Sequence, residues 1–400
     1  MDLITKIVFC ILFIPFSVIL FYEIILFALA LFLDEKSSQS ERKRKFLILI
    51  PAYREGEILI YSLDALEKII YPKHLFDVVL INDQCDDRVI SKLRNKIKVL
   101  DVLLSSHSKA ESLKEAIELA NGYNFVVILD ADNIVHPDFL IELNNSITKS
   151  TKVIQGLRLP KNLNSTFEKI DAITDYVYNQ LDRLIPSKLG LSGTLSGSGF
   201  AIETNLFRDL IPLIQTKGGF DKILQSELLL RKIPVEICSK AIIYDEKIGS
   251  SKSYLKQRTR WLYYHFYNSI KYGLKLLVKG ILNFNFNQIH IGLISLRPPL
   301  NFIYFISLIL IIIGYWICLL CSIILFILLL IFTLVLSKIL KENKVLSVKL
   351  ILSLPLIFIN QIFSVIKFRE AKTDSLKTEH HKSRSIEEIL QSQKSKRRDE

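Results

Sequence analysis

The chain has few cysteines, and their spacing offers no structural framework. Its 400 residues include five cysteines, and none has the spacing of a zinc site. Cys85 and Cys238 give no reason to expect a disulfide in a reducing compartment. Cys318 and Cys321 have the spacing of a redox motif, but they lie in an apolar run without a strand–helix–strand context, so packing is the better interpretation. A disulfide-stapled domain is not expected.

The chain also lacks a signature of nucleic-acid binding, although it is basic. Its formal net charge is +12 at pH 7, but no zinc-ligand spacing or RNA-binding motif accompanies that charge. A basic surface of this kind fits a protein held against anionic lipid. We therefore expect membrane lipids as partners and no nucleic acid.

Half of the residues are apolar, and the excess lies near the two ends of the chain. Residues 7–33 form an apolar run broken only by Glu23, and as a helix it would reach about 40 Å, enough to cross a bilayer. A cleaved signal peptide is the alternative, because residues 28–30 resemble a cleavage site, but the run is too long for one. We predict a transmembrane anchor over 1–40. Glu23 is costly in lipid and should face another helix or the interface.

Basic residues next to the apolar runs predict the topology. The basic cluster at 41–45 follows the anchor, and by the positive-inside rule it keeps the middle of the chain cytoplasmic. Residues 301–337 are long enough for a transmembrane hairpin. Residues 338–400 would form a basic cytoplasmic tail that contains an interfacial or re-entrant helix at 346–366. A fourth span, with the tail outside, is the alternative.

The middle of the chain alternates short β-rich runs with helical stretches, which predicts parallel strands with helices on both faces. The strands are expected at 46–50, 78–81, 99–104 and 125–129, and the helices at 57–70, 89–96 and 110–120. We assign residues 44–250 to this α/β domain, with a further helix at 165–184 and a glycine-rich segment at 191–200. Residues 251–300 would carry a site segment and interfacial helices.

Two aspartates follow a buried strand and predict a metal site. Asp130 and Asp132 come directly after the run that ends at residue 129, and in extended backbone their side chains would point the same way. Carboxylates suit Mg²⁺ or Mn²⁺, with phosphate oxygens and water completing the shell. Such pairs are often solvated turns, but the buried strand and the following Asn133 favour a site.

Two further aspartates stand at positions where a carboxylate either acts chemically or simply caps a helix. Asp83 ends the second strand, where it would accept a hydrogen bond from the N–H edge of uracil or serve as an N-cap. Asp221 opens a helix on the other half of the domain, where it would take a proton from an acceptor hydroxyl. Glu227 and Asp245 are fallback candidates for that base.

A pentad of basic, polar and aromatic residues follows the domain on a helix. Gln257 and Trp261 share a face, with Arg258 and Arg260 beside them. Arginine binds phosphate oxygens in bidentate fashion, and an indole stacks on a sugar ring. The aromatic and basic residues that continue this helix are also typical of a membrane interface, so a site segment that passes into an interfacial helix is expected. Earlier in the chain, Tyr53 offers a ring for a nucleotide base.

In this order, these residues resemble those of the membrane-bound family-2 glycosyltransferases, in the branch of cellulose and hyaluronan synthases and of bacterial enzymes of unassigned product. The resemblance covers roughly residues 44–272. The matching motifs are Pro51-Ala52-Tyr53-Arg54-Glu55, Asp83, Asp130 with Asp132, Gly197-Ser198-Gly199, Gly219-Phe220-Asp221, Tyr244-Asp245-Glu246-Lys247 and Gln257-Arg258-Thr259-Arg260-Trp261.

The resemblance implies a GT-A fold with a Rossmann-like, mostly parallel sheet, and inversion at the anomeric carbon. Donor-binding residues would be Pro51, Tyr53, Glu55, Asp83, Lys109 on the diphosphate, and Asp130; the metal would lie at Asp132 with Asp130. Asp221 would be the base, and Gly197, Ser198, Gly199 and the pentad would border the acceptor and the diphosphate. The chain departs from the family at Phe220, where an acidic residue is common before the base.

The predicted function is metal-dependent transfer of a sugar from a UDP-sugar to a lipid-linked or polysaccharide acceptor. The enzyme would be a multi-pass protein of the bacterial cytoplasmic membrane, with any export partner unidentified. One alternative is transfer to a polyprenyl phosphate, against which the pentad argues. A second is a non-catalytic membrane scaffold with a decayed transferase domain, against which the retained acidic residues argue.

Overall fold

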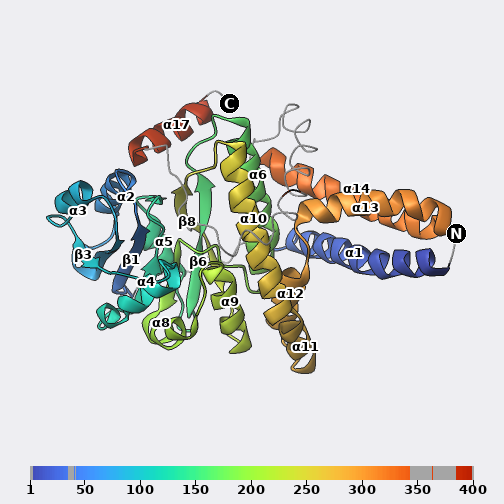
Figure 1. Ribbon diagram of the computed structural model, residues 1–400, viewed down its shortest axis with the longest axis horizontal. Helices are drawn as coiled ribbons and strands as arrows, with labels where there is room; N and C mark the ends of the chain where they lie inside the picture. Colours follow the sequence, from blue (N-terminus) through green and yellow to red (C-terminus); the bar gives the residue numbers. More distant parts are fainter. Residues whose placement is uncertain (1–2, 35–39, 41, 343–362, 364–383, 399–400) are drawn as a thin grey trace.

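The computed structural model describes residues 3–34, 40, 42–342, 363 and 384–398, and its centre is one eight-stranded sheet (Figure 1). The strand order is β3-β2-β1-β4-β7-β6-β8-β5. The bounds are β1 Phe46–Tyr53, β2 Phe76–Asp83, β3 Lys98–Asp101, β4 Phe125–Ile128, β5 Ile134–Val135, β6 Val153–Pro160, β7 Phe200–Glu203 and β8 Glu236–Asp245.

The sheet is mixed, but most of its neighbouring pairs are parallel, including β6 with β8. Strands β3, β2, β1 and β4 are parallel neighbours, as the alternation of strands and helices predicts. Strand β7 runs antiparallel to both β4 and β6, and β5 runs antiparallel to β8. The glycine-rich segment causes the first reversal, because Gly197 and Gly199 have left-handed backbone angles that lead the chain into β7. Hydrophobic periodicity carries no information about strand direction.

Helices cover both faces of the sheet. Those of the α/β domain are α2 Ile58–Glu67, α3 Asp87–Leu93, α4 Lys109–Glu115, α5 Phe139–Ser146, α6 Thr166–Asn179, α7 Ile185–Lys188, α8 Thr204–Leu210 and α9 Phe220–Leu230. They are followed by α10 Ser251–Asn268, α11 Leu274–Leu282, α12 Phe286–Leu296, α13 Leu300–Ile317, α14 Leu319–Glu342 and α17 Ile386–Arg398, with α1 Leu3–Ala30 at the start. Short turns of π-helix, η3 Gln180–Leu184 and η5 Ser269–Gly273, follow α6 and α10.

Two hydrophobic cores lie on opposite faces of the sheet, because side chains alternate along each strand. On β1, Ile48 and Ile50 face the core formed with α2, α3 and α5, while Leu47 and Leu49 face the core formed with α4, α8 and α9. All four side chains are buried. A strand buried on both faces appears in the sequence as a continuous apolar run.

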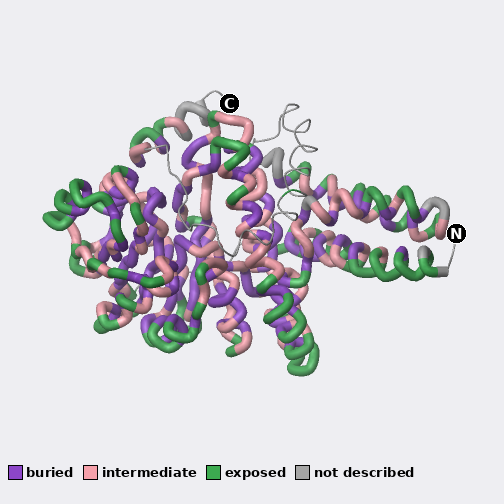
Figure 2. Tube along the Cα trace, viewed as in Figure 1, coloured by how far each residue is buried: buried purple, intermediate pink, exposed green. Residues whose placement is uncertain are grey.

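Helices α1, α13 and α14 project from this domain as a bundle, with the N-terminus near its far end (Figure 1). Many of their residues are exposed, in contrast to the buried sheet (Figure 2). Lys6–Ala30 and Leu319–Ile339 are long and apolar enough to cross a membrane, whereas the apolar stretch of α13, Phe302–Gly314, is shorter. The apolar run predicted as a hairpin thus forms two helices, with the break at Cys318.

A buried cluster of charges joins the bundle to the domain. Arg297, between α12 and α13, donates one hydrogen bond to Glu23 of α1 and two, both of 2.8 Å, to the carboxylate of Asp182 in η3. All three side chains are buried. Glu23, expected to face another helix or the interface, is thus buried within the protein, and its partner is an arginine distant in sequence.

The C-terminal helix α17 packs on the α/β domain. Ile386 and Ile389 are buried in the core that contains α2, and Glu387 forms an ion pair with Lys68. This part of the predicted basic tail is therefore an integral layer of the fold. The interfacial or re-entrant helix predicted at 346–366 lies outside the described residues, apart from position 363.

Candidate functional site

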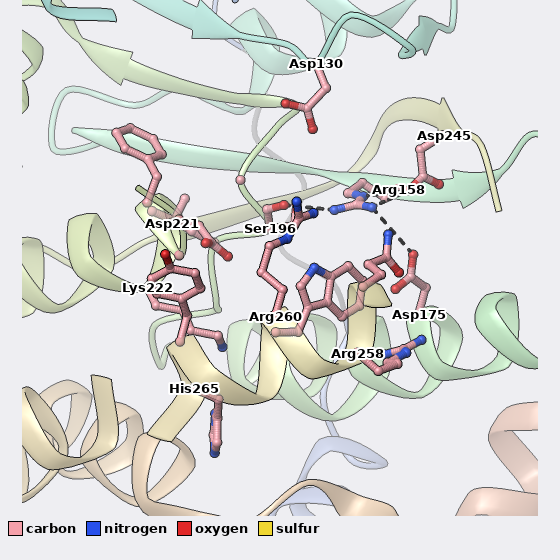
Figure 3. Close-up of a pocket in the computed structure, with 18 of the residues that line it drawn as sticks. Asp130, Arg158, Asp175, Ser196, Asp221, Lys222, Asp245, Arg258, Arg260 and His265 are labelled. Carbon is pink, nitrogen blue, oxygen red and sulfur yellow. Dashed lines mark hydrogen bonds and ion pairs between the residues drawn. The ribbon is translucent and has the colours of Figure 1, made fainter. Parts of the chain in front are cut away.

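A cavity of about 960 Å³ opens where the sheet meets α6, α9 and α10. Figure 3 shows Asp130, Asp221 and Arg260 directed into it from three different elements. Its size is at the upper end of the range for sites that enclose small ligands. The predicted site residues that line it are Pro51, Tyr53, Glu55, Lys109, Asp130, Asp132, Gly197, Asp221, Gln257, Arg258, Arg260 and Trp261.

The end of β1 supplies an aromatic wall. The Tyr53 ring stacks on the ring of His107, with 4.5 Å between centroids and 18° between planes. Asp83, at the end of β2, is only 1% exposed and does not line the cavity itself. Its carboxylate accepts a 2.7 Å hydrogen bond from Nδ1 of His107, which does line the cavity. The sequence analysis missed His107, because a single histidine in a polar loop carries no motif.

The Asp130–Asp132 pair lies in a turn between β4 and β5. Here the expectation of extended backbone was wrong: the N–H of Asn133 bonds to the carbonyl of Asp130, which closes a turn. The amide side chain of Asn133 accepts from the N–H of Asp130 and donates to the Asp132 carboxylate at 3.2 Å. The Asn133 amide therefore holds the turn and the Asp132 carboxylate, and strand periodicity does not decide where the two carboxylates point.

Lys109 ties Asp130 to the glycine-rich segment. From the first turn of α4, its ammonium forms an ion pair with Asp130 and donates a 2.7 Å hydrogen bond to the carbonyl of Gly197. Burial would raise the pKa of Asp130, but the positive charges of Lys109 and Arg158 outweigh it and lower that pKa. Asp130 is therefore held as a carboxylate, and the 43% exposure of its side chain favours the same charged form.

The glycine-rich segment contributes one of its three predicted residues to the cavity wall. Gly197 lines the cavity. A Cβ at this position would lie 3.7 Å from Cβ of Asp221, which is ordinary van der Waals contact. Ser198 is fully buried and Gly199 packs against Ile243, so neither lines the cavity. Their contribution is to the turn into β7 rather than to the wall.

Asp221 lies in the first turn of α9 and faces the cavity. Gly219 caps the helix with left-handed backbone, and Gly218 and Gly219 lie against the ring of Tyr264 on α10. A Cβ at Gly218 would come within 2.4 Å of that ring. The two glycines therefore let the loop that carries Asp221 rest directly on the helix of the pentad.

The two fallback candidates for the base form hydrogen bonds or ion pairs with other residues. Glu227 does not line the cavity; it accepts hydrogen bonds from Arg231 at 2.8 Å and from the Tyr272 hydroxyl at 3.0 Å. Asp245 lines the cavity, but it is buried in ion pairs with Arg158 and Lys247. Of the three carboxylates, Asp221 is the one that lines the cavity without an ion pair among the described contacts.

A buried charge cluster forms one side of the cavity, and the sequence analysis did not foresee it. Arg158 of β6 and Lys247 both pair with Asp245, and Lys247 also pairs with Asp175 of α6. Burial alone would raise the pKa of Asp175, but Lys247 and Arg158 hold that pKa well below its ordinary value. The available signals were Arg158 within the largely apolar β6 and the charged residues of the motif at 244–247.

The pentad lies on α10 and presents four of its residues to the cavity, while Thr259 bonds to the helix backbone instead. Arg258 is held between the rings of Tyr254 and Trp261, at 4.9 and 4.6 Å, and donates to Asp171 at 2.5 Å. Arg258 therefore braces α10 against α6. Arg260 extends toward Ser196 in the cavity (Figure 3).

The protein offers two carboxylates for a metal at this place, Asp130 and Asp132. Among the described residues, no three histidine, cysteine, aspartate or glutamate side chains are grouped to hold a metal ion. Any cation bound between Asp130 and Asp132 would take its other ligands from a bound molecule or from water. The pairing of Asp130 with Lys109 indicates that a positive charge is favoured there.

Comparisons with known proteins agree on one family. A family model described as glycosyltransferase like family 2 matches residues 43–264. The probable glycosyltransferase YdaM of Bacillus subtilis is 24% identical over 238 residues, which cover 54% of each chain. The poly(ribitol-phosphate) beta-N-acetylglucosaminyltransferase TarS of Staphylococcus aureus is 29% identical over 101 residues, covering 24% of this chain and 18% of TarS. The chain thus spans about half the length of YdaM and less than a fifth of TarS.

One solved structure resembles the chain over most of its length. The mannosyltransferase PcManGT from Pyrobaculum calidifontis, solved in complex with GDP-Man and Mn²⁺, superposes with a TM-score of 0.59 at 13% identity. The match covers 91% of this chain and 98% of that one. At this identity the likeness concerns the fold alone, which is the GT-A glycosyltransferase fold.

Proposed function

Because the chain belongs to glycosyltransferase family 2, we propose that it transfers a sugar from a UDP-sugar to a lipid-linked or polysaccharide acceptor, with inversion and with a divalent metal. The observation that carries the proposal is that Asp130, Asp132 and Asp221 line one cavity with Tyr53 and Arg260. The carboxylates of Asp130 and Asp132 would bind a cation, and the carboxylate of Asp221 would accept a proton from the acceptor.

The donor would lie along the edge of β1 and β4. Tyr53 offers a ring for the base, and Asp83 offers a carboxylate for a ring N–H of uracil. Mg²⁺ or Mn²⁺ fits between Asp130 and Asp132, since two hard oxygen donors suit a cation that takes its remaining ligands from diphosphate and water. Bound there, it would neutralise charge on the departing diphosphate. Lys109 and Arg260 line the same space and add positive charge toward that diphosphate.

Asp221 would act on the acceptor from the opposite wall. The acceptor oxygen forms a bond to the anomeric carbon, the bond from that carbon to the diphosphate oxygen breaks, and the hydroxyl proton passes to Asp221. A single displacement of this kind inverts the anomeric centre. Gly197 lies beside Asp221 without a side chain, which leaves room for the approaching hydroxyl.

The far end of the cavity favours an acceptor held by the membrane. Arg297, Pro299 and Phe302 line it where α12 passes into α13. Two helices of the bundle are long enough to span a bilayer, and the turn between α11 and α12 exposes Phe284 by 86% and Phe286 by 71%. We place this end at the cytoplasmic membrane face, because the basic cluster at 41–45 follows the first span.

The experiment that tests the proposal is turnover by protein purified from membranes, with a panel of UDP-sugars, GDP-mannose and a membrane lipid extract as acceptor source. We expect nucleotide release from a UDP-sugar, falling at least about tenfold in EDTA and in Asp132→Ala. GDP-mannose is the comparison donor because PcManGT was solved with it. Turnover of GDP-mannose alone, or undiminished turnover in EDTA, would contradict the proposal. Extraction into organic solvent separates a lipid-linked product from a free polysaccharide, and the number of sugars on the extracted lipid separates a polyprenyl-phosphate sugar from a longer saccharide.

A substitution away from the carboxylates tests how Asp221 is positioned. Gly218→Ala places a Cβ within 2.4 Å of the Tyr264 ring, so the ring or the loop that carries Asp221 must move. Because displacement of a reacting group by about 1 Å costs up to about 100-fold, we expect turnover to fall roughly 10- to 100-fold. Gly56→Ala, at a glycine with open space around it, is the matched control. Equal turnover in the two variants would show that the contact does not position Asp221.

A further inference from the structure

Asp83 and Tyr53 of the proposed base site already contact a ring of the protein itself. His107 stacks on Tyr53 at 4.5 Å and 18°, and its Nδ1 lies 2.7 Å from the Asp83 carboxylate. A carboxylate only accepts hydrogen bonds, so Nδ1 carries the proton and donates it. These are the two contacts that the proposed function gives to the base, namely a stack on Tyr53 and an N–H donated to Asp83.

A base that stacked on the same side of the Tyr53 ring and donated to Oδ2 of Asp83 would need the place that His107 holds. Asp83 is 1% exposed, and His107 is the donor to its Oδ2, while Oδ1 has no hydrogen-bond partner among the described residues. A buried carboxylate that loses its donor is costly, so a donor must take the place of His107 when that ring leaves. The guanidinium of Arg54 also lies against this ring, 5.1 Å from its centroid.

The loop that carries His107 is fixed, whereas the side chain has room to leave. Hydrogen bonds to Glu111 of α4 hold the serines on either side of His107. The Glu111 carboxylate accepts from the Ser105 hydroxyl and from the Ser106 N–H, both at 2.9 Å, and also from the Ser106 hydroxyl. The Glu111 N–H donates to the Ser108 hydroxyl at 3.2 Å. His107 has a left-handed backbone angle, φ 47°, which histidine tolerates better than most residues. Its side chain is 27% exposed at the cavity rim, so rotation about its own bonds frees it without moving α4.

We propose that His107 is the residue that sets donor affinity in this enzyme, by occupying the base subsite until a nucleobase with a ring N–H displaces it. The proposal rests on the proposed function, because it takes Tyr53 and Asp83 as the base subsite. It goes further in assigning an internal competitor to that subsite. The apparent affinity for the nucleotide is then the intrinsic affinity reduced by the fraction of molecules in which His107 is stacked.

The test is calorimetric binding of UDP, uridine and inorganic pyrophosphate, each with Mn²⁺, to wild type, His107→Ala and His107→Phe. Removing the competitor should increase the affinity for UDP and for uridine by the same factor. We expect about tenfold, the value of one hydrogen bond to a carboxylate. His107→Phe keeps a ring for the stack but loses the N–H, so its gain should be smaller. Pyrophosphate has no base, and its affinity should not change. His74→Ala, at an exposed histidine before β2, should match wild type throughout.

The outcomes separate this inference from the function beneath it. If wild type binds UDP and His107→Ala binds it equally or more weakly, His107 is not a competitor, and the inference falls while the proposed function stands. If tightening extends to pyrophosphate, the effect is not at the base subsite and the inference falls likewise. If no nucleotide binds wild type or variants with intact thermal unfolding, the proposed function fails and takes the inference with it.

Discussion

Asp221→Asn is expected to abolish sugar transfer while leaving UDP binding close to wild type. The amide is nearly the same size as the carboxylate and keeps the loop on Tyr264, but it cannot take a proton from the acceptor hydroxyl. General-base catalysis contributes about 10²- to 10⁴-fold, and turnover should fall by that factor. The measurement is turnover with the preferred donor, paired with calorimetric binding of UDP.

Glu227→Gln is the matched control for this prediction. It makes the same change in the same helix, at a carboxylate that bonds to Arg231 and Tyr272 outside the cavity. Turnover in this variant should stay within about twofold of wild type, since an exposed pair of this kind contributes little. If Asp221→Asn retains turnover, Asp221 is not the base. Asp245 would then have to leave its ion pairs with Arg158 and Lys247 to act.

The parts of the fold that depend on local pattern could be predicted from the sequence. The buried runs of β1 and β4 are continuous because both faces of these strands are covered, and that signal is unambiguous. The pentad was correctly placed on a helix because its face repeats at helical spacing. Asp130 and Asp132 were found because they follow such a run, even though a turn and not a strand orients them.

The parts that depend on partners distant in sequence could not be predicted. Arg258 was expected on phosphate, but a helix pattern cannot show that Asp171 lies opposite it. Asp83 was expected to face the donor, and nothing local reveals that its carboxylate bonds to His107, which lines the cavity in its place. Arg258 lines the cavity, and Asp83 lies one hydrogen bond behind its wall. Which partner each side chain contacts depends on how the helices and strands pack together, and that packing leaves no periodic pattern in the sequence.

The second large effect is expected at Arg297, where the bundle of α1, α13 and α14 meets the α/β domain. Its guanidinium bonds to Glu23 of α1 and to both oxygens of Asp182, and its backbone carbonyl accepts from Nε2 of His265 at 2.8 Å. Burial, together with the charge of Lys222, lowers the pKa of His265 to about 3, so this ring is neutral and donates. Three elements far apart in the chain therefore meet at one arginine.

Arg297→Met should lower the free energy of unfolding by about 3–5 kcal/mol, because it leaves two carboxylates buried without a cation. Thermal unfolding in detergent measures the change, and Arg231→Met, which removes an exposed i,i+4 partner of Glu227, should cost less than about 1 kcal/mol. The triple variant Glu23→Gln, Asp182→Asn, Arg297→Met removes the charges together. It should recover most of the loss, since replacing a whole buried ion cluster is often neutral. An Arg297→Met protein as stable as wild type would mean that the junction is held by the apolar packing of α1, α13 and α14 alone.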